Sequence, residues 1–181
     1  MKVIDTLIDD VKIIEPRIFK DARGFFMETF RQSWFVENIY NATFVQDNHS
    51  QSIANTLRGL HYQLNNPQGK LVRVISGCVI DIAVDLRKSS STFGHHVAVE
   101  LSSQNHRQLW VPPGFAHGFY VISEQAEFVY KFTDYYTPGD EYCLVWNDAE
   151  LGVDWDLAEK SPVVSDKDER GLSLKDAPYY E

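Results

Sequence analysis

The chain has 181 residues, 44% of them apolar, which is enough to bury one core in a single domain covering residues 1–181. The formal net charge of −9, without a long run of Lys or Arg, argues against nucleic acid as a partner, and any anionic ligand would need a local cationic cluster. No segment has the pattern of a signal peptide or the length of a membrane span, so we expect a cytoplasmic protein with no membrane partner.

Short stretches typical of β-strands recur along the chain and are separated by turn-forming residues. In chain order, we predict strands over residues 11–14, 24–30, 43–52, 56–63, 71–86, 96–101, 108–112, 118–123, 127–134 and 142–146. The longest run is expected to bend or break at Ser76 and Gly77, which gives two strands. Many short strands at this spacing predict an all-β protein, with a jelly roll as the natural architecture.

Helix signals are few and short, which predicts only small peripheral helices. Residues 33–40 form one candidate, with Ser33 as its N-cap, and parts of residues 157–174 form another. The tail after Lys175 is rich in tyrosine and acidic residues, has little periodicity and is expected to fray.

The chain contains two cysteines, Cys78 and Cys143. They lie far apart in the sequence, each within an apolar strand-like run. This placement favours buried thiols over a disulfide bond or a catalytic nucleophile.

One histidine stands where a metal-binding relative would place two. Metalloenzymes with a cupin-like double-stranded β-helix usually carry His-x-His followed by Glu, and then Pro-x-Gly-x-x-His on a later hairpin. The later half is present at residues 112–117, but Gln63 occupies the second histidine position after His61, and residues 67–69 carry no carboxylate. A divalent transition metal usually takes three or four side-chain ligands, so we expect no metal. A general base needs only one oriented imidazole.

The segment around His61 leaves two interpretations open. On a regular strand, an offset of three residues puts Arg58 and His61 on opposite faces. A bulge at Gly59 could bring them together, or Arg58 could serve another part of a site. The alternative is a histidine satisfied in the core beside an ordinary surface arginine.

Two tyrosines are candidates for different roles. Tyr130 shares a strand face with Phe128 and Phe132, so it is either a core residue with a hydrogen-bonded hydroxyl or a proton donor in a dry cavity. Tyr136 lies in a turn, where it could stack on a flat ring or belong to a loop lid.

Several polar segments add candidate binding residues. Residues 46–50 are all polar within a strand-like run, so some of them are expected to face a wet pocket. Arg23 lies at a tight turn with Glu28 five residues on. Residues 165–168, taken alone, have the pattern of a solvated turn or a helix cap.

Together these segments resemble a known family over nearly the whole chain. The matching stretches are Arg23-Gly24-Phe25 with Glu28, residues 44–50, 57–61, 68–73, 113–119 and 127–131, Tyr135-Tyr136, and residues 165–168. Each stretch alone is weak evidence, but eight in the same order are specific. The chain resembles the nucleotide-sugar 3,5-epimerases, and among them the dTDP-4-dehydrorhamnose 3,5-epimerase family.

The resemblance implies a cofactor-free jelly roll, usually a homodimer, that inverts C3 and C5 of dTDP-4-dehydro-6-deoxy-D-glucose to give dTDP-4-dehydro-L-rhamnose. It implies His61 as the base, Asp168 as its partner and Tyr130 as the proton donor. It also implies Lys70 beside the sugar carbonyl and Tyr136 stacked on the thymine. The remaining positions at which the family binds its substrate are Arg23, Glu28, Gln46, Asp47, Asn48, Arg58, His117, Glu141 and Lys167.

Other functions share parts of this pattern. A mono-epimerase that inverts only C3 or only C5 would carry the same motifs. A metal-dependent oxygenase on the same barrel would need the ligand that Gln63 replaces. A sugar-nucleotide-binding module without catalysis would need the pocket but not both His61 and Tyr130.

Overall fold

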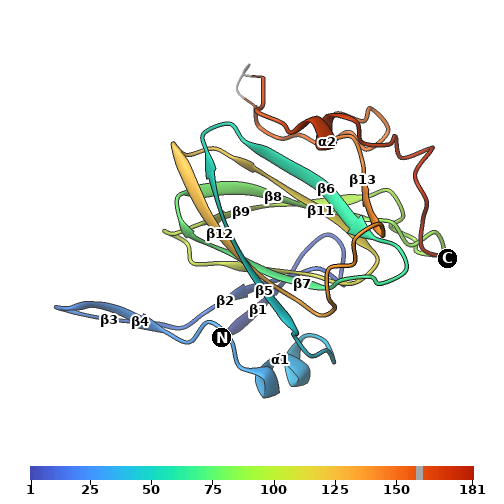
Figure 1. Cartoon of the computed structure of the whole chain (residues 1–181). Helices are drawn as coiled ribbons and strands as arrows, with labels where there is room; N and C mark the ends of the chain where they lie inside the picture. Colours follow the sequence, from blue (N-terminus) through green and yellow to red (C-terminus); the bar gives the residue numbers. More distant parts are fainter. Residues whose placement is uncertain (158–160) are drawn as a thin grey trace.

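The computed structural model describes residues 1–157 and 161–181, and within them two antiparallel sheets pack face to face (Figure 1). The first sheet has six strands in the order β1 (Lys2–Asp5), β2 (Lys12–Glu15), β10 (Gln108–Val111), β7 (Lys70–Ser76), β12 (Gln125–Phe132) and β5 (Gln46–Ile53). The second has five strands in the order β13 (Glu141–Cys143), β6 (Leu57–Gln63), β11 (Phe115–Val121), β8 (Cys78–Asp85) and β9 (His96–Ser102). The all-β jelly roll expected from the sequence is confirmed.

The core lies between the two sheets and follows from the alternation of apolar residues along each strand. Val72 and Leu109 from the six-stranded sheet are fully buried against residues of the five-stranded sheet. Phe119 of β11 and Phe128 of β12 stack with their ring centroids 4.4 Å apart and so join the sheets directly. A second apolar cluster covers the outer side of the five-stranded sheet, where the C-terminal segment packs.

A separate hairpin projects from the sandwich on the side of the first helix (Figure 1). It consists of β3 (Ile18–Asp21) and β4 (Gly24–Met27) and carries exposed phenylalanines. The sequence predicted β4 but not β3, since residues 18–21 are partly or fully exposed and show no buried alternation. The edge strand β1 was missed as well. The expected break at Ser76 and Gly77 is confirmed, because β7 ends at Ser76 and β8 begins at Cys78.

The helices are short and peripheral, as expected. Helix α1 (Gln32–Asn38) follows residue Arg31 at the N-cap, so the prediction of Ser33 as N-cap was wrong. The helix is fixed by packing instead: Phe35 lies against Trp110, with ring centroids 5.1 Å apart. Helix α2 (Asp166–Glu169) falls within the second predicted region, of which residues 158–160 lie outside the described residues.

The tail after Lys175 does not fray, which corrects the expectation from its sequence. The hydroxyl of Tyr180 donates to the Gln63 carbonyl oxygen, and that of Tyr62 donates to the Pro178 carbonyl oxygen at 2.8 Å. The backbone of Tyr180 also forms an isolated parallel β-bridge with that of Arg87. Within the described ranges, no helix has the length and apolar character needed to cross a membrane.

Candidate active site

A pocket of about 430 Å³ opens between the two sheets and gathers most of the polar residues singled out from the sequence. His61 lines it from β6 of the five-stranded sheet, and Tyr130 lines it from β12 of the six-stranded sheet. The two residues therefore face the pocket from opposite walls. Other lining residues are Gln46, Asn48, Lys70, Tyr136, Glu141 and Lys167.

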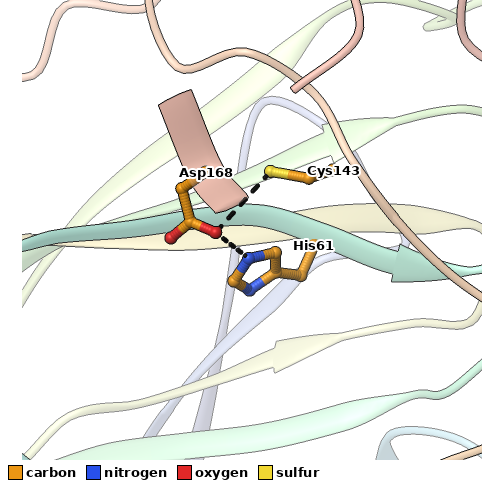
Figure 2. Close-up of side chains that lie close together, drawn as sticks. All are labelled: His61, Cys143 and Asp168. Carbon is orange, nitrogen blue, oxygen red and sulfur yellow. Dashed lines mark hydrogen bonds and ion pairs between the residues drawn. The ribbon is translucent and has the colours of Figure 1, made fainter. Parts of the chain in front are cut away.

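His61 is held from behind by a buried carboxylate (Figure 2). Its Nε2 lies 2.6 Å from Oδ1 of Asp168, whose side chain is 5% exposed against 28% for His61. The second carboxylate oxygen, Oδ2, accepts a hydrogen bond from the Gly59 backbone N–H at 3.2 Å. The Ser165 hydroxyl caps helix α2 by accepting from the Asp168 N–H, which fixes the start of the short helix.

The charge state of Asp168 defines which nitrogen of His61 is free. Burial of Asp168 acts to raise its pKa, but hydrogen bonds from His61 and the Gly59 N–H outweigh burial and hold the pKa of that carboxyl below its usual value. An ionised Asp168 accepts a hydrogen bond donated by the Nε2–H of His61. The neutral imidazole then has its lone pair on Nδ1, which Figure 2 shows turned away from Asp168.

A bulge in β6 aligns the residues on either side of it. His61 pairs with His117 of β11 and Arg58 pairs with Phe119, so Gly59 and Leu60 together oppose the single residue at position 118. Arg58 and His61 consequently line one adjoining pocket, although they are three residues apart. This confirms the bulge considered at Gly59. A Cβ atom at Gly59 would lie 2.6 Å from the Gly118 Cα, so the close approach requires glycine.

Lys70 contributes a buried cation to the pocket floor. Its side chain is almost fully buried, and Nζ donates a hydrogen bond to the His61 carbonyl oxygen at 3.1 Å. Burial lowers the pKa of Lys70 from 10.5 to about 8, although the carboxylates of Asp81 and Glu141 oppose this shift. At pH 7 the group is therefore still mainly an ammonium, and its positive charge is poorly screened by water.

His117 does not reach the pocket wall in this structure. It is buried, and its Nε2 lies 2.9 Å from Oδ1 of the fully buried Asp81. Burial lowers the pKa of His117 and raises that of Asp81. For each side chain, burial therefore favours the neutral form over the charged form. The sequence had suggested a substrate contact for His117, and nothing in the sequence had singled out Asp81.

Three further candidates lie apart from the two pockets that His61 lines. Arg23 is at the tip of the β3–β4 hairpin in an exposed ion pair with Asp21. Glu28 pairs with Arg31, and Asp47 pairs with Lys131. Asp47 is on the face of β5 opposite Gln46 and Asn48, because successive side chains of a strand alternate.

The outer rim of the pocket joins an aromatic residue to an ion pair. The Tyr136 hydroxyl lies 3.3 Å from the Glu141 carboxylate, which also pairs with Lys167. Partial burial acts to lower the pKa of Lys167, but its hydrogen bond to Glu141 raises that pKa overall. The half-exposed ring of Tyr136 thus stands at the rim beside a fixed positive group.

Two glutamines hold the segment that carries Tyr136, a role that the sequence did not reveal. Gln63 is 2% exposed, and its Oε1 accepts from the Thr137 N–H at 2.7 Å. Its Nε2 donates to the carbonyl oxygens of Asn66 at 2.9 Å and Tyr135 at 3.2 Å. The Gln46 carbonyl oxygen Oε1 accepts from the Tyr136 N–H at 3.0 Å. The sequence signal for this role was a glutamine, Gln63, at the end of a strand with an otherwise apolar buried face.

Asp140 fastens the neighbouring loops in a similar way and was also missed. Its carboxylate accepts hydrogen bonds from the backbone N–H groups of Asn65 at 3.0 Å and Asn66 at 2.8 Å. Burial acts to raise the pKa of Asp140, but these N–H donors hold it below its usual value. The loop after β6 is thereby tied to the loop before β13.

The residues at the expected metal-binding positions are committed to other partners. The side chain of Gln63 is hydrogen-bonded to backbone groups, and His117 is hydrogen-bonded to Asp81. One set within the described part of the chain does bring three possible ligand atoms within 4.8 Å of one another, namely those of His61, Cys143 and Asp168. Burial and the charge of Asp168 raise the pKa of the Cys143 thiol to about 12, so the thiol is protonated.

Comparison with known proteins places this chain in a family. The family model described as dTDP-4-dehydrorhamnose 3,5-epimerase matches residues 5–176. The chain belongs to this family. The dTDP-4-dehydrorhamnose 3,5-epimerase of Pseudomonas aeruginosa is 53% identical over 178 residues, which cover 98% of each protein. That of Neisseria gonorrhoeae is 56% identical over 98% of this chain, which spans only about half of that protein (54%).

Solved structures of relatives agree with the fold. The dTDP-6-deoxy-D-glucose-3,5-epimerase of Legionella pneumophila, in complex with dTDP-4-keto-L-rhamnose, matches with a TM-score of 0.95 and 48% identity over 99% of this chain and 98% of that one. A 3'-monoepimerase of Streptomyces bikiniensis, in complex with dTDP-quinovose, matches with a TM-score of 0.88 and 28% identity over 94% of this chain and 87% of that one. The present chain is therefore an epimerase, and the resemblance noted in its sequence is confirmed.

Proposed function

We propose that this chain inverts C3 and C5 of dTDP-4-dehydro-6-deoxy-D-glucose to give dTDP-4-dehydro-L-rhamnose, with no metal or organic cofactor. The observation that carries the proposal is the position of His61, backed by Asp168, on one wall of a pocket and of Tyr130 on the opposite wall. A base and an acid on opposite sides of a bound sugar ring are the minimum needed to invert a carbon centre.

His61 is the base in this mechanism. The C4 ketone of the sugar acidifies the C–H bonds at both C3 and C5, so one base on one face can serve both carbons after a small shift of the ring. Nδ1 of His61 accepts the proton, and the resulting imidazolium donates from Nε2 to the Asp168 carboxylate at 2.6 Å. Asp168 thus orients the ring and stabilises its charged form.

Lys70 and Tyr130 complete each inversion. Removal of the proton leaves an enolate oxygen at C4, and a buried ammonium such as Lys70 can stabilise that charge by ~3–4 kcal/mol. Tyr130 then donates its phenolic proton to the carbon from the opposite face, since protonation from the side of His61 would restore the starting configuration. Its neighbours Phe128 and Phe132, with ring centroids 5.5 and 5.3 Å away, fix the ring.

The nucleotide part of the substrate is assigned to the rim. Tyr136 supplies a half-exposed aromatic face for the thymine, and the adjacent ion pair of Glu141 and Lys167 offers hydrogen-bond partners. The guanidinium of Arg58 is held near the base by the Ser52 hydroxyl at 3.0 Å and supplies positive charge for the diphosphate. Gln46 and Asn48 line the pocket that Tyr136 borders, which adjoins that of Arg58.

We further propose that the active form is a homodimer in the cytoplasm, a compartment that the two free cysteines favour. Arg23 lies on a projecting hairpin, outside the His61 pockets of its own chain, and Phe26 beside it is 70% exposed. Docking this hairpin against a second copy would bury its phenylalanines and carry Arg23 toward the partner's pocket. Mixing inactive Arg23→Ala and His61→Asn variants should then restore activity through mixed dimers.

The alternative within the family is a mono-epimerase, and one experiment distinguishes the two. Identity to the double epimerase of Legionella is 48%, against 28% to the Streptomyces mono-epimerase, which favours double inversion. Proton NMR of the 4-keto sugar nucleotide in deuterium oxide reports which carbons exchange and which isomer forms. Exchange confined to one carbon would establish a mono-epimerase instead.

A variant of the base tests the assignment of residues in the same assay. His61→Asn should abolish exchange at both carbons while dTDP binding, measured by calorimetry, stays within about threefold because the rim is untouched. His95→Asn, which changes an exposed histidine that lines neither pocket, is the matched control. Exchange at the wild-type rate in His61→Asn would place the base elsewhere.

A further inference from the structure

Cys143 is a buried thiol next to the proposed base that the mechanism does not use. It faces His61 directly in the pairing of β13 with β6 and is 8% exposed. Its Sγ lies 3.3 Å from the Leu144 carbonyl oxygen and 4.0 Å from Oδ1 of Asp168. Figure 2 shows the thiol and the imidazole approaching the same carboxylate oxygen. A thiol and a carboxylate thus converge behind the base, and with the imidazole of His61 they make three kinds of metal ligand.

We propose that His61, Cys143 and Asp168 form an inhibitory site for a borderline-soft divalent cation such as Zn²⁺, and that the bound cation switches the base off. Their ligand atoms lie within 4.8 Å of one another. With metal–ligand bonds of ~2.0–2.3 Å, the ligands of a tetrahedral zinc stand ~3.3–3.8 Å apart. The site therefore needs an opening of the 2.6 Å His61–Asp168 contact and an inward rotation of the Cys143 side chain.

The charges of the three groups suit such a cation. A thiolate, a carboxylate and a neutral imidazole carry two negative charges, which balance Zn²⁺. The nearby ammonium of Lys167 is already paired with Glu141, which limits its repulsion of the metal. His61 is 28% exposed toward the two pockets that it lines, so a water or solvent-derived ligand can take the fourth position.

The consequence for catalysis rests on the proposed role of His61. The metal takes Nε2, so the proton of the neutral imidazole moves to Nδ1, the nitrogen that must accept a proton from the sugar. The Cys143 thiol loses its proton to solvent, and Asp168 is already ionised, so binding releases one proton in all. Affinity therefore rises with pH. Because the metal lies behind the imidazole and not in the sugar pocket, kcat falls while KM is unchanged.

Direct binding of Co²⁺ to the substrate-free protein is the first test. Tetrahedral cobalt bound to a thiolate gives a charge-transfer band in the near ultraviolet. Added Zn²⁺ should displace the cobalt and abolish this band. The band should vanish in Cys143→Ser and Cys143→Ala, with Zn²⁺ affinity lowered by roughly 100-fold or more, since even loss of an outer hydrogen-bond partner costs 10–100-fold. Cys78→Ala, which removes the other free cysteine on β8, should keep the band.

Activity supplies the second test, with free Zn²⁺ buffered because the substrate diphosphate also binds it. Zn²⁺ should lower kcat of the wild type and of Cys78→Ala but leave Cys143→Ser active. Equal inhibition of Cys143→Ser, or a Co²⁺ spectrum without the thiolate band in the wild type, would overturn the proposal. Failure of the metal-free wild type to epimerise counts against the proposed function instead, and the cobalt spectrum still decides whether the metal site exists.

Discussion

Replacing Lys70 by Met should yield a protein that is more stable than the wild type at neutral pH but nearly inactive. Burial of the ammonium lowers its pKa from 10.5 to about 8, which corresponds to an unfavourable ~3 kcal/mol at pH 7. The methionine side chain has a similar length without the charge. Loss of the hydrogen bond to the His61 carbonyl oxygen destabilises the variant by ~1 kcal/mol. The net increase in the free energy of unfolding should therefore be about 2 kcal/mol.

The pH dependence of this gain has a definite sign. A lysine whose pKa is lowered by folding binds more protons in the unfolded chain than in the native one. Wild-type stability therefore rises with pH as Lys70 deprotonates, relative to the variant. The advantage of Lys70→Met is fully present below pH 8, shrinks between pH 8 and 10.5, and is absent above that range.

Turnover should change in the opposite direction. Without a cation near the enolate oxygen, kcat should fall by ~10²–10³-fold, the cost of removing one such donor. Urea unfolding monitored by circular dichroism at pH 7 and pH 10, together with the NMR assay, measures both effects, and the exposed Lys88→Met is the control. A variant that is less stable than the wild type by the same amount at both pH values would refute the reasoning about burial.

Three other changes give distinct outcomes. Tyr130→Phe keeps the packing between Phe128 and Phe132 but removes the donor, so deuterium incorporation should outrun formation of the doubly inverted sugar; double inversion at the wild-type rate would make the tyrosine a core residue. Gln63→Met removes the hydrogen bonds to the Tyr136 segment, so KM should rise by roughly tenfold or more while kcat changes little. Gln108 is equally buried and donates to the Thr29 carbonyl oxygen, so Gln108→Met controls for general destabilisation. Prolonged chelation should leave activity unchanged, and a loss that added metal restores would contradict the metal-free mechanism.

Local sequence patterns were sufficient for the elements with one buried face. Apart from the edge strand β1, strand-like sequence patterns predicted the strands of both sheets, and Gly59, two residues before His61, pointed to the bulge that aligns Arg58. The β3–β4 hairpin could not be found this way in full, because its residues are mostly exposed and bury no alternating face. The fraying predicted for the tail failed for a related reason: its tyrosines make contacts with distant strands that no local pattern encodes.

The candidate site was predictable in part, and mostly through the family resemblance. Nothing local could pair Asp168 with His61, since they are 107 residues apart in the sequence. The same limit applies to Asp81 beneath His117, and to Gln63, whose partners lie on another loop. These contacts depend on the packing of strands remote in sequence. Arg23, by contrast, was singled out from the sequence but lies outside the His61 pockets of its own chain.

The distance along the chain between His61 and Asp168 also affects how the protein becomes active during its synthesis. Every strand of both sheets, and with them His61, Lys70 and Tyr130, precedes helix α2. A nascent chain can therefore assemble both sheets while its imidazole still has no carboxylate behind it. In the proposed mechanism, the base has its carboxylate partner only once residues 165–168 have folded and Asp168 lies behind β6. After a proteolytic cut between β13 and α2, Asp168 would be held behind His61 only by noncovalent contacts of the C-terminal segment, such as the hydrogen bond from the Tyr62 hydroxyl to the Pro178 carbonyl oxygen.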